Sequence, residues 1–426
     1  MKKIGMTVAV AMLMAAPAAF GAEVIKAEGV VVDVGGRFEA SGIIQQLDDP
    51  FRNDTRMYMF LKQARLLMSG NISDTRFKVQ VGFANEDEAK APSPGVSIGL
   101  LDMYLDVPIK ALGQNNFVRV GQYKVPFGLE RLSDPQTVNF GERSISNLAL
   151  RVGRDMGATF HASVGNFHGI AGVFTGGGRD VPERYLPEVL GVPMLSARFG
   201  YDNGLYENAF ADQRKDLGGT RFAVNLDGIY LIDSNIGHST VLNVKLGERS
   251  LLTNTNWNPY ISQSPFSVGT LMQAGIDGAV RVPVGPGALK GEAEADWGRY
   301  SNGYGQVSLG AVRAMAGYQW GPLEGDLRYG VVLPSNNLTN KGVAITGTDP
   351  FHEVTPSLTM RFNMPGSPRL TADLPILINV PVVTEAGLGN YVVTEQPDQV
   401  SLISTTTNSI ARQNVVEARL MFEAQF

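Results

Sequence analysis

Apolar residues occupy every second position in several stretches of this chain, notably 75–85, 289–298, 357–364 and 415–426. In the last stretch most of the intervening positions are polar or charged, and the apolar positions are Val416, Ala418, Leu420, Phe422, Ala424 and Phe426. Because successive side chains of a β-strand point to opposite faces, this alternation predicts strands with one apolar and one polar face. The last strand ends on the aromatic Phe426, as the closing strand of an outer-membrane barrel commonly does.

Two architectures share this alternation. A β-sandwich turns the apolar face of each strand toward its core, whereas a transmembrane barrel turns it toward lipid. In 289–298 the polar face carries four charged residues, Lys290, Glu292, Glu294 and Asp296. Such a face suits a wide, wet lumen and bulk solvent equally well. The periodicity by itself therefore leaves both architectures open.

The connections between the strands are of two kinds. Turn signals occur at 71–73, 165–166, 285–287, 321–322 and 365–367. Longer polar or Pro/Gly-rich segments occur at 45–56, 86–96, 126–155, 176–192, 334–351 and 377–412. Short turns at one end and long loops at the other are typical of outer-membrane barrels, and a sandwich does not require this asymmetry. The connections therefore favour the barrel.

The number of strands is constrained by the requirement that both ends of the barrel domain lie on the short-turn side, which makes the number even. Seventeen stretches qualify as strands, near 33–45, 56–70, 74–85, 97–107, 115–125, 156–164, 166–175, 193–202, 219–231, 237–247, 267–283, 286–300, 306–319, 324–333, 352–364, 367–376 and 414–426. We interpret 237–247 as part of a loop. The prediction is a sixteen-stranded antiparallel transmembrane barrel, wide enough for an aqueous channel.

The N-terminal residues predict the destination of the protein. Lys2 and Lys3 precede an apolar run over 4–16, and small residues follow up to Ala22. This is the pattern of a secretory signal peptide cleaved after Gly21 or Ala22. A membrane anchor is the alternative, but the run is shorter than the roughly 20 residues that a spanning helix needs. We expect 1–22 to be a signal peptide and 23–426 to form one barrel domain in the outer membrane of a Gram-negative cell.

Composition removes several functional classes. The chain has no cysteine, which excludes thiolate metal sites, cysteine catalysis and c-type haem attachment. The formal net charge is −5 and becomes −7 once Lys2 and Lys3 leave with the signal peptide. Such an acidic balance gives no indication of nucleic-acid binding.

Indications of catalysis or of metal binding are weak. The run Gly95-Val96-Ser97-Ile98-Gly99 has the spelling of a nucleophile elbow, but it stands between a Pro-rich loop and a strand instead of at a strand-to-helix turn. The four histidines, His161, His168, His238 and His352, have no metal-ligand spacing. We therefore expect no enzyme activity, metal ion or cofactor.

The segment 126–155 is the most informative part of the chain. It follows a strand, carries several charged residues and is also rich in apolar ones, including Leu129, Leu132, Phe140, Ile145 and Leu150. A loop of this length in a compact domain is usually functional or disordered. In a wide barrel it can pack against the inner wall and narrow the pore, or it can stay outside with its charges solvated. We favour the inward-folded third loop.

The residues around this loop resemble a known family. The run GQYKVPFGLER at 121–131, followed by Glu142-Arg143, resembles the signature of the phosphate-selective porins O and P. Further similar stretches are LKQARL at 61–66, LDMY at 101–104 and AGVFTG at 171–176. The match is good over 56–200 and loose beyond. It implies a sixteen-stranded barrel, usually a homotrimer in outer-membrane lipid, with the third loop folded into the lumen.

The resemblance also implies an anion site at the pore constriction. The family's loop arginine corresponds to Arg143, its loop lysine to Arg131, its wall aspartate to Asp102 and a wall lysine to Arg119. Its second-strand arginine pair falls at Lys62 and Gln63. Together with two further nearby cations, the candidate constriction and anion-binding residues are Arg131, Arg143, Arg119, Asp102, Lys62, Arg65 and Lys124.

Several positions depart from the family pattern. Asp134 stands where a loop serine binds the anion, Gln136 stands in place of a loop lysine, and Gln63 replaces an arginine. An anion needs several donors and net positive charge at the constriction to replace its hydration. The resemblance therefore supports the fold more firmly than the selectivity.

We expect a channel for passive diffusion of small hydrophilic or anionic solutes, with a weak anion preference. High phosphate specificity is a sharper version of this expectation. A structural barrel within a larger envelope complex, with little channel activity of its own, is the alternative.

Overall fold

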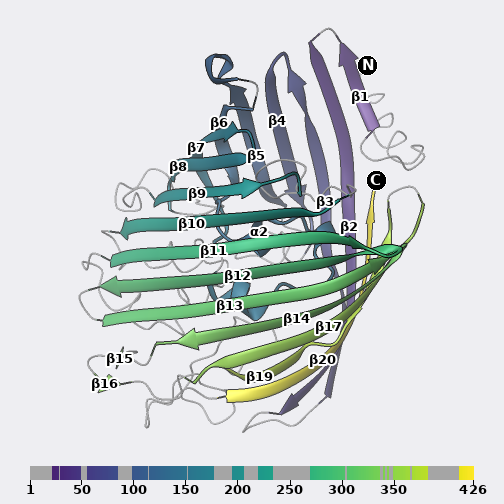
Figure 1. Ribbon diagram of the computed structural model, residues 1–426, viewed down its shortest axis with the longest axis vertical. Helices are drawn as coiled ribbons and strands as arrows, with labels where there is room; N and C mark the ends of the chain where they lie inside the picture. The colour runs from purple at the N-terminus through teal and green to yellow at the C-terminus, as the bar shows by residue number, and fades with distance from the viewer. Residues whose placement is uncertain are drawn as a thin grey trace, which may run out of the picture.

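The protein is described by a computed structural model over residues 22–27, 29–48, 55–84, 98–113, 115–150, 152–176, 194–205, 219–233, 269–302, 305–335, 339–340, 343–344, 349–364, 367–381 and 412–426. Almost all of these residues belong to one antiparallel sheet that closes on itself (Figure 1). The closure is made by the last strand, whose residues pair with the first strand of the ring from Arg37↔Gln425 to Asp48↔Asn414.

The ring has sixteen strand positions in the part of the chain that is described. In chain order they are β2 (Val30–Asp48), β3 (Thr55–Ile72), β4 (Thr75–Gly82), β5 (Gly99–Pro108), β6 (Phe117–Lys124), β7 (Arg154–Val164), β8 (Phe167–Phe174), β9 (Met194–Asp202), β10 (Arg221–Asp233), β11 (Gly269–Val284), β12 (Gly287–Asn302), β13 (Gly305–Trp320), β14 (Leu323–Pro334), β17 (Phe351–Arg361), the pair β18 (Arg369–Asp373) and β19 (Ile376–Pro381), and β20 (Arg412–Gln425). Each strand hydrogen-bonds to its neighbours in sequence. The predicted closed, sixteen-stranded antiparallel barrel is confirmed.

Two of the predicted strand assignments need comment. The strand predicted at 367–376 is interrupted, because β18 and β19 share one position between β17 and β20 on either side of Leu374 and Pro375. A proline lacks the N–H group that a ladder requires, which accounts for a break there. The segment 237–247, which we interpreted as a loop, lies outside the described residues.

Three short strands lie outside the ring. β1 (Ala22–Ala27) pairs with the start of β2, where the sequence indicated only a lead segment before the first strand. β15 (Thr339–Asn340) and β16 (Val343–Ala344) form a small hairpin of their own. β1 occupies the same edge of β2 as β20 does, just beyond the end of β20.

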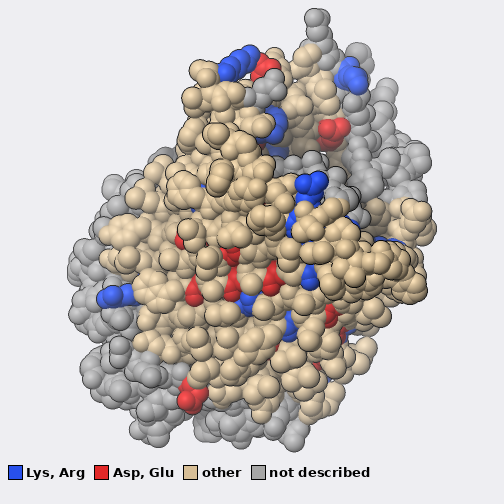
Figure 2. Space-filling view, in the orientation of Figure 1, with Lys and Arg blue, Asp and Glu red and all other residues tan. Residues whose placement is uncertain are grey.

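The two faces of the wall differ in the way that the alternation of β20 predicts. Leu420 and Phe422 are 52% and 41% exposed on the outer face, whereas Glu417, Arg419 and Glu423 are buried on the inner face. Figure 2 shows that uncharged residues dominate the outer face of β10–β14, with few acidic and basic residues between them. The apolar face therefore points outward, as in a transmembrane barrel and not as in a sandwich.

Helices are few and short in the described part of the chain. They are η1 (Lys110–Leu112) between β5 and β6, and α2 (Leu129–Leu132), η2 (Pro135–Thr137) and α3 (Ile145–Leu150) in the segment between β6 and β7. No helix among the described residues has the length and hydrophobicity that crossing a bilayer would require.

Candidate pore constriction

The segment between β6 and β7, of which residues 125–150 and 152–153 are described, lies against the inner face of the wall; we call it the third loop. Acidic side chains of the far wall accept hydrogen bonds from its backbone. The contacts are Gly128 N to Asp227 Oδ2 (3.0 Å), Glu130 N to Glu294 Oε2 (3.0 Å), Gly141 N to Asp373 Oδ2 (2.7 Å) and Ile145 N to Glu353 Oε2 (2.7 Å). These acceptors lie on β10, β12, β18 and β17, so the loop reaches across the lumen.

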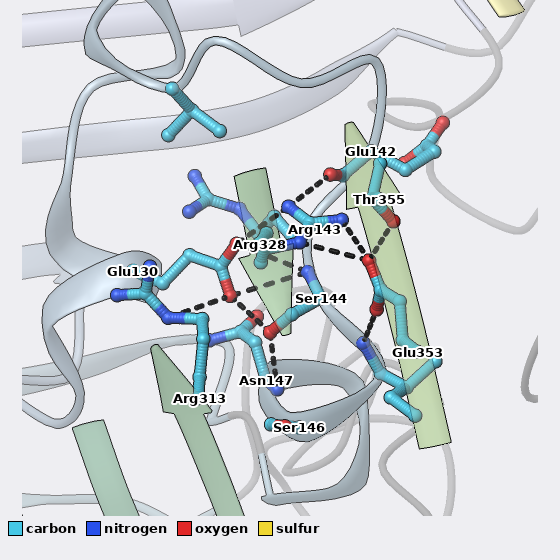
Figure 3. A network of polar contacts seen from close by, with 12 residues as sticks. Glu130, Glu142, Arg143, Ser144, Ser146, Asn147, Arg313, Arg328, Glu353 and Thr355 are labelled. Carbon is cyan, nitrogen blue, oxygen red and sulfur yellow. Dashed lines mark hydrogen bonds and ion pairs between the residues drawn. The ribbon is translucent and has the colours of Figure 1, made fainter. Parts of the chain in front are cut away.

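The middle of the loop is held by Glu130 (Figure 3). Its carboxylate accepts hydrogen bonds from Ser144 N (3.0 Å) and Ser144 Oγ (2.5 Å), and it pairs with Arg328 Nη1 of the wall at 3.2 Å. Burial alone would raise the pKa of Glu130, but the positive charges of Arg313, Arg328 and Arg143 outweigh that effect and hold the pKa below its usual value. Glu130 is therefore a charged, buried residue that connects the first part of the loop to Ser144 and to Arg328 of the wall.

The second half of the loop is held by apolar packing. Ile145, Ala149, Leu150 and Val152 are buried in one cluster with inward-facing apolar residues at the long-loop ends of the far strands. These wall residues are Ile229, Leu231, Leu271, Leu309, Ala311, Val332, Phe351, Leu377, Val380 and Val415. This part of the lumen is consequently filled by an apolar core.

The loop also touches the wall on its other side. Asp134 pairs with Arg37 of β2 at 3.4 Å, and Glu142 pairs with Lys62 of β3 at 3.1 Å. Lys62 also donates a hydrogen bond to the carbonyl oxygen of Gly141. The third loop is thus fastened at both sides of the barrel.

Exposure of the inward-facing side chains locates the open part of the lumen. On β9–β20 most of the described charged wall residues are buried, as Arg198, Arg328 and Glu353 illustrate; the half-buried ones are Arg221, Arg281, Lys290, Glu292, Arg299 and Arg361. On β3 and β4, by contrast, Arg65 and Gln80 are half-buried, and the side chain of Lys78 is 30% exposed. The space left by the loop therefore runs along β3–β6. We call this opening, between those strands and the third loop, the eyelet.

Three predicted cations donate hydrogen bonds to backbone oxygens of the third loop. Lys124, at the end of β6, donates to the carbonyl oxygens of Leu132 (3.1 Å) and Ser133 (3.4 Å). Arg143 donates from Nη2 to the same Ser133 oxygen at 3.3 Å. Arg131 donates from Nε to Val152 O at 3.0 Å, which ties the beginning of the loop to its end.

The predicted wall aspartate lies within a cationic group. Asp102 on β5 accepts a hydrogen bond from Arg154 Nε at 2.7 Å and lies 3.8 Å from Lys78 Nζ. Neither Arg154 nor Lys78 was among the predicted site residues. Lys78 stands on the polar side of the alternation in 75–85 and could have been found from that pattern. The position of Arg154 depends on the path of the third loop and could not.

A β-bulge brings two neighbouring residues of β3 to the lumen. In the β2–β3 ladder Glu39 faces Gln63 and Ala40 faces Leu61, which leaves Lys62 as the extra residue. A bulge re-aims the side chains of a strand, and here both Lys62 and Gln63 are buried on the inner side. Arg65 lies two residues farther on and shares the face of Gln63.

Arg119 differs from the other predicted residues. It lies on β6, as expected for a wall residue, five residues before Lys124 and toward the short-turn end of the strand. Its Nε and Nη2 atoms contact both carboxylate oxygens of Asp106 at 2.7 Å and 3.0 Å. Its guanidinium carbon lies 3.9 Å from the centre of the Tyr104 ring. This charge is therefore neutralised locally and held in place.

Charge at the eyelet is unevenly balanced. Among the eyelet residues named above, the half-buried cations are Arg65, Lys78, Lys124 and Arg143, and the half-buried acids are Asp134 and Glu142. No group of three or more histidine, aspartate or glutamate residues within the described ranges has a metal-binding arrangement. The site is thus a polar constriction with an excess of positive charge.

Comparison with known proteins connects this geometry to porins. Residues 32–186 match the family model of the phosphate-selective porins O and P, which confirms the predicted resemblance over that part of the chain. No curated protein matches the chain in a sequence search.

Solved structures with a similar fold include an anion-selective porin from Comamonas acidovorans, with a TM-score of 0.59 and 13% identity over 93% of this chain and 100% of that one. OmpF of Salmonella typhi in complex with daunomycin has a TM-score of 0.52 and 10% identity over 94% and 99% of the two chains. OmpT of Vibrio cholerae has a TM-score of 0.51 and 10% identity over 94% and 100%. The chain therefore has the outer-membrane porin fold.

Proposed function

We propose that this barrel is an outer-membrane channel through which small hydrophilic solutes diffuse passively, with a preference for anions set at the eyelet. The observation that carries the proposal is the excess of cations over acids around the opening, where Lys78, Lys124 and Arg143 are only partly buried. A narrow passage lined by charges of one sign concentrates counter-ions and lowers the barrier for their entry.

The acidic composition of the chain does not contradict this preference. Many of its carboxylates are used to hold the third loop, since Asp227, Glu294, Asp373 and Glu353 each accept a backbone hydrogen bond from it. These groups are buried between loop and wall. The field in the passage is therefore governed by the eyelet residues more than by the net charge.

The proposal is tested by the reversal potential of the purified protein in planar bilayers under a potassium chloride gradient. We expect an anion-selective channel in the wild type. Neutralising two eyelet cations, by Lys78→Gln and Arg143→Gln together, should reduce the chloride-to-potassium permeability ratio about threefold or more. Lys110→Gln is the matched control, because Lys110 is exposed and pairs with Asp74 at the short-turn surface.

Two results would refute the proposal. A cation-selective wild type would exclude anion preference. An unchanged chloride-to-potassium permeability ratio in the double variant would show that the eyelet cations do not cause the preference. A folded barrel without conductance would favour the structural alternative.

We further propose that the protein is exported with cleavage after Gly21 or Ala22 and assembles as a homotrimer in outer-membrane lipid. The pattern of residues 1–22 and the family match over 32–186 support these proposals. N-terminal sequencing of the protein from outer-membrane fractions and native mass spectrometry in detergent test them separately.

A further inference from the structure

We infer that Asp134 and Glu142 make the eyelet pass monovalent anions and reject multivalent oxyanions such as sulfate or hydrogen phosphate. The inference rests on the proposed anion channel and names the class of anion that it admits. Both residues belong to the third loop, and each pairs with a cation of the opposite wall.

The two carboxylates differ from the other acids that fasten the loop. The side chains of Asp134 and Glu142 are 30% and 34% exposed, whereas the anchoring Glu353 and Glu130 are buried. Because the loop lies within the ring, the exposed parts of Asp134 and Glu142 face the space of the lumen. A passing anion therefore meets these negative charges as well as the cations.

The wall cations that pair with Asp134 and Glu142 also pair with other carboxylates. Arg37 contacts Glu423 at 3.1 Å in addition to Asp134. Lys62 contacts Glu39 at 3.6 Å in addition to Glu142. Arg369 also pairs with Glu423, at 2.7 Å. Arg37 and Lys62 are thus each shared between two carboxylates, so negative charge lies on this side of the eyelet, facing the cations of β4–β6.

An eyelet with opposite charges on its two sides discriminates by the charge of the anion. The cost of removing an ion from water rises steeply with its charge, and a multivalent oxyanion recovers that cost only where several donors converge on it without a nearby acceptor. Asp134 and Glu142 supply acceptors at that place, and their charges offset part of the attraction by the cations that a multivalent anion needs to recover its hydration. A monovalent anion needs less compensation and can pass along the cationic side.

The test measures block of the chloride current by sulfate in planar bilayers, with the wild type and the Asp134→Asn/Glu142→Gln variant. These substitutions keep the size of the side chains and remove the two charges. We expect weak block of the wild type and a fall of at least about tenfold in the half-blocking sulfate concentration of the variant. Nitrate, a monovalent oxyanion, should affect both proteins equally.

Asp74→Asn is the control, because Asp74 is an exposed carboxylate in the turn between β3 and β4 and should leave sulfate block unchanged. Heat-modifiable migration in gels verifies that each variant is folded, and Asp134→Asn alone is measured if the double variant is not. An unchanged half-blocking concentration in a folded, anion-selective variant would overturn the inference. A cation-selective wild type would instead refute the proposed function, so the two failures are distinguishable.

Discussion

The ring of Phe426 lies directly on the backbone of Gly36, where a Cβ atom would stand 2.3 Å from the ring. The same two residues exchange backbone hydrogen bonds, with Phe426 N donating to Gly36 O at 3.1 Å and Gly36 N donating to Phe426 O at 2.6 Å. The end of the last strand therefore contacts the first strand of the ring at Gly36.

We predict that Gly36→Ala reduces the amount of assembled barrel, because the added methyl group meets the Phe426 ring. Overpacking of this kind costs about 1–3 kcal/mol. Deletion of Phe426 should act in the same direction, by removing the contact altogether. The heat-modifiable fraction in outer membranes measures both effects. Gly325→Ala is the control, since no atom lies within 4 Å of its Cβ position, and equal yields for all three variants would contradict the prediction.

Glu353→Ala should loosen the third loop. Glu353 accepts hydrogen bonds from Arg328 Nε at 2.9 Å and from Ile145 N at 2.7 Å, and both donors are buried. Removing one partner of a buried ion pair leaves the other uncompensated, at a cost of about 3–5 kcal/mol. We expect larger and more variable single-channel currents in bilayers. A steady current of wild-type size would show that the loop does not depend on this anchor.

The lowered pKa of Glu130 predicts how the stability of the protein depends on pH. Because its pKa in the folded protein is lowered, its contribution to stability is fully present above the ordinary glutamate pKa of about 4.3. That contribution is lost as the pH falls through the lowered, folded-state value. The difference in Tm between wild type and Glu130→Gln should therefore be constant from about pH 8 to pH 5 and shrink in stronger acid. A difference that vanishes already at neutral pH would contradict this account.

Leu150→Ala should destabilise the loop without affecting the wall. Leu150 is almost fully buried in the apolar cluster between α3 and the far strands. Large-to-small changes in such sites cost about 2–5 kcal/mol. We expect faster proteolysis of the loop in detergent-solubilised protein. Leu420→Ala removes the same side chain from the outer face, where it is exposed, and should leave the cleavage rate unchanged.

Arg119→Gln should change ion selectivity less than Arg143→Gln does. The Arg119 charge is matched by both oxygens of Asp106, and Arg76 lies 3.4 Å from the same carboxylate and can partly replace it. Reversal potentials of the two single variants give the comparison. A larger shift for Arg119→Gln would mean that the short-turn half of the lumen, and not the eyelet, controls selectivity.

Local sequence was sufficient for the strands and their faces. The alternation in 415–426 placed Leu420 and Phe422 outward and Arg419 inward, because the two-residue period of a strand depends only on neighbouring backbone units. Loop lengths and the requirement for an even number led to sixteen strands, the number of strand positions in the closed ring. β1 was missed, since its six residues carry no clear alternation and are held by pairing with β2.

The constriction was decided by the tertiary structure. Arg143, Arg131 and Lys124 could be named from the sequence, but the partners that position the loop lie far away along the chain. Ile145 and Glu353 are separated by 208 positions, and Gly141 and Asp373 by 232. No local pattern encodes such contacts, because they form only when the barrel closes and brings the far wall opposite the loop. The sequence by itself determined a porin-like barrel and a list of charges; closure of the ring decided which charges hold the loop and which face the open passage.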